Sequence, residues 1–99
     1  MVKYVVVCGE LSKGGVLGLQ VKNPETSSLD KARKIAVEYL IRHPKWEFTT
    51  IPIIDSRTDR LVGSVKRAMG DTGFIFFKRD GNKVIKWDVR LNGTLGEKW

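Results

Sequence analysis

Glycines gather near the N-terminus in a stretch that can be compared with phosphate-binding loops. A P-loop reads G-x-x-x-x-G-K-[ST], in which the lysine reaches the phosphates and the hydroxyl residue holds magnesium. Gly9 and Gly14 have the required separation, but Gly15 and Val16 stand where the lysine and the hydroxyl residue belong. The dinucleotide pattern G-x-G-x-x-G fails as well, because the glycines of this stretch have other spacings. We therefore interpret Ser12–Gly15 as a hairpin connection and expect no nucleotide cofactor.

The chain holds one cysteine and one histidine, the residues next considered for nucleophilic or metal chemistry. Cys8 would need an exposed position and a base such as His43 to act as a nucleophile. It instead ends an apolar run, where a free cysteine normally packs as a small hydrophobe. His43 is expected at a helix end, in a capping or packing role. The two residues cannot fill a four-ligand zinc site, so we expect no metal and no other cofactor.

Carboxylates add no catalytic arrangement. Their spacing along the chain forces no two acids together. Four aspartates mark loops and turns, where aspartates form local hydrogen bonds: Asp55, Asp59, Asp71 and Asp80. The sequence therefore contains no catalytic constellation that can be recognised, and we expect a protein that is not an enzyme.

Positive charge is concentrated in the second half of the chain. The formal net charge is +7. Residues 57–90 hold nine Lys and Arg against four Asp and Glu, a balance of +5, whereas residues 1–56 hold eight against six, a balance of +2. Such a field attracts polyanions, namely nucleic acid, an acidic membrane or an acidic protein surface. The competing explanation is that the positive net charge serves only to keep the protein soluble.

The candidate site consists of cations and aromatic residues from this basic half. We expect four cations on or near one sheet face, with Phe74 or Phe76 stacking on bases: Lys66, Lys78, Lys86 and Arg90. Three further cations are placed at the turns of that sheet: Arg67, Arg79 and Lys83. The alternative is that the lysines form an ordinary solvated face, while residues 74–77 form a central strand covered on both sides.

One helix is expected between Ser27 or Ser28, as the cap, and Pro44, which ends it. Apolar residues recur at helical spacing and define one stripe: Leu29, Ala32, Ile35, Ala36, Tyr39, Leu40 and His43. Val37 and Ile41 interrupt the polar side. They are therefore either covered by another element or exposed to a partner.

The remaining segments are typical of β-structure. Strands are expected at Lys3–Leu11, Val16–Lys22, Trp46–Asp55, Leu61–Met69, Phe74–Arg79 and Lys83–Leu91. Pro52 cannot donate to a ladder, which favours an edge position or a bulge for its strand. In the last strand Ile85, Trp87, Val89 and Leu91 alternate with Val84, Lys86, Asp88 and Arg90, which indicates one face on a core and one in water.

These elements predict a single α+β domain over residues 1–99 with two layers. A mostly antiparallel sheet of five or six strands, in the order β-β-α-β-β-β-β, packs on one helix. Residues 92–99 either fold back onto this body or form a flexible tail. The order of the first elements resembles, in pattern, that of several small bacterial and phage domains, a resemblance that assigns no residue a role.

Two functions follow as hypotheses. The first is a small non-enzymatic domain that binds DNA or RNA through the basic sheet. The second is a protein-interaction module or small homo-oligomer of bacterial or phage origin, associating through Val37, Ile41 or the Pro52 strand. The absence of an apolar stretch near 18 residues predicts no membrane span. The lack of disulfides favours the cytoplasm.

Overall fold

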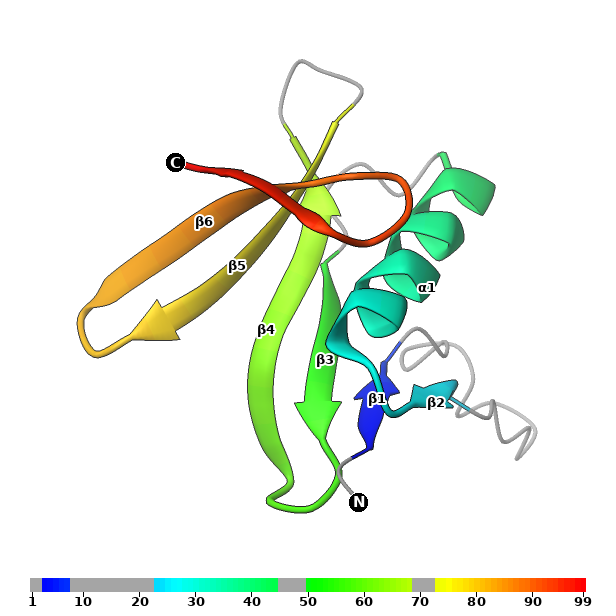
Figure 1. The fold of residues 1–99 in the computed structure, drawn as a ribbon, viewed down its shortest axis with the longest axis vertical. Helices are drawn as coiled ribbons and strands as arrows, with labels where there is room; N and C mark the ends of the chain where they lie inside the picture. The colour runs from blue at the N-terminus through cyan, green and yellow to red at the C-terminus, as the bar shows by residue number, and fades with distance from the viewer. Residues whose placement is uncertain (1–2, 8–22, 45–49, 69–72) are drawn as a thin grey trace.

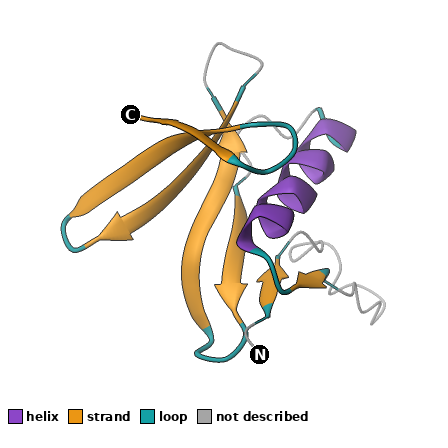
Figure 2. Ribbon diagram, viewed as in Figure 1, coloured by secondary structure: helices purple, strands orange, loops and turns teal. Residues whose placement is uncertain are grey.

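One helix and a seven-stranded antiparallel sheet make up the part of the chain described by the computed structural model, namely residues 3–7, 23–44, 50–68 and 73–99 (Figures 1 and 2). The strands lie in the order β2-β1-β3-β4-β5-β6-β7. Their bounds are β1 Tyr4–Val6, β2 Glu25–Thr26, β3 Ile51–Asp55, β4 Arg60–Arg67, β5 Phe74–Asp80, β6 Lys83–Val89 and β7 Leu95–Lys98. The expected two-layer α+β architecture is confirmed, with more strands than the five or six expected.

Helix α1 spans Leu29–Arg42, inside the bounds that the sequence predicts. The side chain of Ser28 accepts a hydrogen bond from the backbone N–H of Lys31 at 3.3 Å, which satisfies one of the free amides of the first turn. His43 is the C-cap, and Pro44 follows it. The hydroxyl at the start and the proline just beyond the end therefore define this helix.

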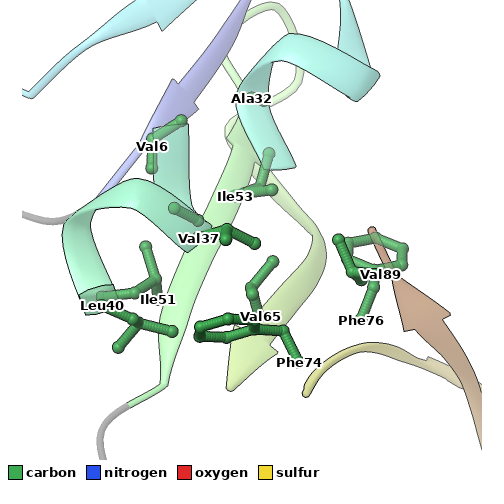
Figure 3. Close-up of a cluster of buried hydrophobic side chains, with 11 residues drawn as sticks. Val6, Ala32, Val37, Leu40, Ile51, Ile53, Val65, Phe74, Phe76 and Val89 are labelled. Atoms are coloured by element: carbon green, nitrogen blue, oxygen red, sulfur yellow. The ribbon is translucent and has the colours of Figure 1, made fainter. Parts of the chain in front are cut away.

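The hydrophobic core lies between α1 and the face of the sheet that α1 covers (Figure 3). Its buried members come from the helix and from five strands: Val6, Ala32, Ala36, Val37, Leu40, Ile51, Ile53, Val65, Phe74, Phe76 and Val89. Most of the strand members are aromatic or β-branched, residue types that suit a pleated, half-buried surface.

The helix is rotated about its axis relative to the stripe expected from periodicity. Arg33 and Val37 are buried, whereas Ile35 and Tyr39 are only half-buried. Val37 therefore belongs to the core and is covered by the sheet. Ile41 remains 50% exposed.

Strand β3 contains Pro52 and lies inside the sheet, between β1 and β4, so of the two expected alternatives the edge position is wrong and the bulge is supported. The carbonyl of Pro52 accepts a hydrogen bond from the N–H of Val7, just beyond the end of β1. Proline has no N–H to donate, but none of the described residues of β1 is paired with Pro52, so no described β1–β3 pair loses a hydrogen bond. A register shift in the β3–β4 ladder follows directly, between Ile53 and Ile54. The proline is thus accommodated beside a bulge.

The C-terminal residues lie against the sheet. Leu95–Lys98 forms β7, which pairs antiparallel with β6, as in the alternative in which this segment folds back onto the body. Several expectations fall outside the described residues: the buried Cys8, the hairpin connection Ser12–Gly15, the strand Val16–Lys22 and the beginning of the strand expected from Trp46.

The hairpin formed by β5 and β6 extends away from the helix (Figure 1). Helix α1 packs mainly against β1, β2, β3 and β4. At the tip, Gly81 has a φ of +62°, as a tight turn after Asp80 requires. The hairpin therefore carries its outermost side chains into solvent.

Candidate functional site

The register of the ladders assigns each side chain of β4, β5 and β6 to one of two faces, because directly opposed residues point the same way. Val65, Phe76 and Trp87 form one row across the three strands, on the face that α1 covers. We call this the helix-side face. Ser64, Phe77 and Lys86 form the neighbouring row, on the opposite face, which we call the outer face.

The four cations of the candidate site do not share a face. Lys66 and Lys86 lie on the outer face. Lys78 lies on the helix-side face, because it alternates with Phe76 along β5 and is paired with Ile85. The single basic face expected from the sequence is therefore wrong.

Phe74 and Phe76 are only 5% and 3% exposed, because both rings belong to the core beneath α1. The expectation that they stack on bases is wrong, since neither ring is accessible in the folded protein. Phe77, which alternates with them, is half-buried on the outer face.

Arg90 lies between β6 and β7 and is exposed. Its Nη1 donates to the carbonyl of Leu95 at 3.2 Å and to Oγ1 of Thr94 at 3.4 Å. Its backbone N–H also donates to the carbonyl of Thr94 at 2.9 Å. The guanidinium thus holds the connection between the two strands, a role that the sequence did not indicate.

Each of the three candidate lysines lies over an aromatic ring. The Nζ atom of Lys66 is 5.3 Å from the ring centroid of Phe77, and that of Lys78 is 5.6 Å from Trp87. The Nζ atom of Lys86 is 5.7 Å from the ring of Trp99. Such contacts are attractive because the negative face of the ring meets the ammonium, and they involve no carboxylate.

Two further cations of the hairpin belong with these lysines. Arg79 and Lys83 are both exposed and flank the turn. Arg79 is paired with Val84 on the outer face, and Lys83 is paired with Asp80 on the helix-side face. The sequence placed both at turns, and the D-G dipeptide was the signal that located them.

The hairpin cations have no carboxylate partner within the described residues. The two ion pairs of the described ranges lie elsewhere, between Arg33 and Asp30 and, at 3.9 Å, between Arg57 and Asp55. The two-stranded arm therefore carries three exposed cations and the half-buried Lys86, against two aspartates, Asp80 and Asp88.

Arg33 and Arg67 have a different role, because both support the helix. The buried Arg33 donates from Nε to the carbonyl of Gly93 at 2.8 Å, pairs with Asp30, and lies 5.1 Å above the ring of Phe76. Burial lowers the pKa of Arg33, and the charge and hydrogen bond of Asp30 oppose this shift. Arg67 donates to the carbonyls of Leu40 and His43 at the end of α1. These arginines are engaged within the fold.

The surfaces expected for protein association are altered by the fold. Val37 lies in the core, and the Pro52 strand is flanked on both sides by other strands. Of the expected contact residues only Ile41 is substantially exposed. Neither an edge-to-edge contact through β3 nor a contact through Val37 is available to a partner.

The single histidine of the chain lies at the end of the helix. His43 packs its ring against Tyr39 with centroids 4.4 Å apart, which agrees with a packing role at the helix end. No group of three or more His, Cys, Asp or Glu side chains in the described ranges is arranged to hold a metal ion. Helix α1, with 14 residues, is neither long nor apolar enough to cross a membrane, and the same described ranges hold no other candidate span.

No protein-family model matches the chain, and no curated protein or solved structure shows significant similarity to it.

Proposed function

We propose that this protein is a small nucleic-acid-binding domain that contacts phosphates with the β5–β6 hairpin. The observation that supports the proposal is a set of cations on this arm that have no carboxylate partner in the described residues, namely the exposed Lys78, Arg79 and Lys83 and the half-buried Lys86. A two-stranded antiparallel ribbon is narrow enough to follow a groove or a phosphate backbone.

The distribution of these cations over both faces suits a ribbon better than a flat sheet. A flat sheet presents one face to a ligand, so that Lys78 and Lys86 would not act together. A projecting arm can be flanked by phosphates on both sides, and the contacts of its cations with phosphates release condensed counterions. The gain in affinity from counterion release is independent of base sequence. The net charge of +7 also favours binding to a polyanion.

Fluorescence anisotropy with a labelled DNA or RNA oligonucleotide tests the proposal. We expect binding at low salt that weakens steeply as salt is added. Replacing Lys78, Arg79 and Lys83 together by glutamine should reduce affinity at least about 10-fold and should lower the slope of log K against log salt by about 2.

The matched control removes three exposed cations from the helix, through Lys31→Gln, Lys34→Gln and Arg42→Gln. The change in net charge is identical, so a general effect of charge would reduce affinity equally in both variants. Equal losses would overturn the assignment to the hairpin. An absence of salt-sensitive binding to both DNA and RNA by the unaltered protein would overturn the function itself.

A further inference from the structure

Aromatic and cationic side chains alternate on the outer face of the hairpin and continue onto the end of β7. The row Ser64, Phe77 and Lys86 crosses β4, β5 and β6. The backbone N–H of Trp99 donates to the carbonyl of Lys86 at 2.9 Å, which places Trp99 beside this row. Lys66 reaches the row from the neighbouring one, with its Nζ over the ring of Phe77.

Trp99 is held in position although it is 64% exposed. Its indole Nε1 donates to Oδ1 of Asp88 at 2.7 Å, and the ammonium of Lys86 lies over the ring. A tryptophan exposed to this extent and fixed by a hydrogen bond has lost part of its freedom before any ligand arrives. It is therefore prepared for stacking at a reduced entropic cost.

The two rings are separated by a distance that the ladder sets. Phe77 lies on β5 and Trp99 lies beyond β6, so two strand spacings of about 4.8 Å each, roughly 10 Å in all, separate their backbones. Lys86 is placed between them. Ile75 lies two residues before Phe77 on β5 and on the same outer face. It is buried, so it limits the accessible surface on that side.

We propose that this outer face binds a single strand of nucleic acid, with unpaired bases stacking on Trp99 and Phe77 while Lys66 and Lys86 contact phosphates. The inference rests on the nucleic-acid-binding function proposed above and specifies its ligand. Unpaired bases expose the π-faces that aromatic side chains need, whereas the bases of a duplex are stacked on one another. When a base arrives, each ammonium moves from its ring to the adjacent backbone.

The test compares three labelled probes of equal length: oligo(dT), oligo(rU) and a DNA duplex of mixed sequence. We expect both single strands to bind at least about 10-fold more tightly than the duplex at the same salt concentration. Trp99→Ala should lower the affinity for the single strands by about 10-fold and leave that for the duplex unchanged. The difference between oligo(dT) and oligo(rU) reports the combined contribution of the 2′-hydroxyl and the thymine methyl group.

Leu61→Ala is the control for the loss of an exposed apolar side chain, because Leu61 is 63% exposed and lies at the distant end of β4. It should change no affinity. Phe77→Leu keeps an apolar side chain on β5 but removes the second aromatic ring, so it tests the same surface independently. It should weaken single-strand binding by about 5-fold or more.

Two negative results separate this inference from the function on which it rests. If the duplex binds as tightly as the single strands and Trp99→Ala changes nothing, the stacking surface is refuted while binding through the hairpin stands. If no probe binds in a salt-sensitive manner, both proposals fall together.

Discussion

The cations near α1 and those of the projecting β5–β6 hairpin differ in their surroundings. Beneath the helix, Arg33 and Arg67 donate to backbone carbonyls and lie against aromatic rings of the core. On the hairpin, Lys78, Arg79 and Lys83 are exposed and are absent from the ion pairs of the described residues. Positive charge thus supports the fold in one region and is exposed to solvent without a carboxylate partner among the described residues in the other.

The difference follows from burial. A buried guanidinium must have its hydrogen bonds satisfied, and its five donors in a fixed fork can reach several carbonyls at once. An exposed lysine has no such requirement, because water solvates it. Burial therefore separates Arg33, whose donors are engaged within the fold, from the exposed cations of the hairpin.

Substitution of glycine should show the largest contrast between the two regions. Gly93 has a φ of +91°, and a Cβ added there would clash with the carbonyl of Asp30 and come within 2.6 Å of the backbone nitrogen of Lys34. Gly93→Ala should lower the free energy of unfolding by about 3 kcal/mol or more, measured by urea denaturation.

Gly81 provides the control, because its φ is also positive, at +62°, but nothing lies within 4 Å of an added Cβ. Gly81→Ala should cost only about 1 kcal/mol, from backbone strain alone. Equal losses for the two variants would contradict the close approach of the β6–β7 connection to α1.

Removing a guanidinium should show a smaller contrast. Arg33→Met keeps an apolar stem of similar length but leaves the buried carbonyl of Gly93 without its donor. We expect the free energy of unfolding to fall by about 1–3 kcal/mol, since an unsatisfied buried polar group costs about this much. Arg79→Met on the hairpin should change it by less than about 0.5 kcal/mol. A destabilisation by Arg79→Met equal to that by Arg33→Met would show that the hairpin arginine also supports the fold.

The smallest contrast is expected between two neighbours on β4. Arg67 faces the helix and donates to carbonyls of its last turn, whereas Lys66 faces outward. Arg67→Met should lower the free energy of unfolding by about 1 kcal/mol, the usual net value of a hydrogen bond, and Lys66→Met should leave it unchanged within about 0.5 kcal/mol. Thermal unfolding of the two variants side by side measures this difference, and the reverse order would refute the assignment of faces.

The sequence predicted the elements better than their orientation. The serine cap and Pro44 located α1 because both act through local geometry. The rotation of the helix could not be predicted, since burial of Arg33 depends on the carbonyl of Gly93, far along the chain. Tertiary contact here overrides a periodicity that placed Arg33 outside the stripe.

The candidate site was predicted in part for a related reason. Alternation along Lys83–Val89 correctly separated Lys86 from Trp87, because both lie on one strand. The placement of Lys66 and Lys78 required the register between β4 and β5, which no local pattern gives. A shift of one residue would have put the two lysines on the same face, as the sequence analysis expected.

The hydrogen bond between Arg33 and Gly93 also has a consequence for biosynthesis. The two residues are 60 positions apart in the chain. At about 5–20 residues per second, a ribosome adds that many residues in roughly 3–12 seconds. During that interval the nascent helix carries an arginine whose backbone acceptor has not yet been made. The hydrogen bond between Arg33 and Gly93 can therefore form only after the connection between β6 and β7 has been synthesised.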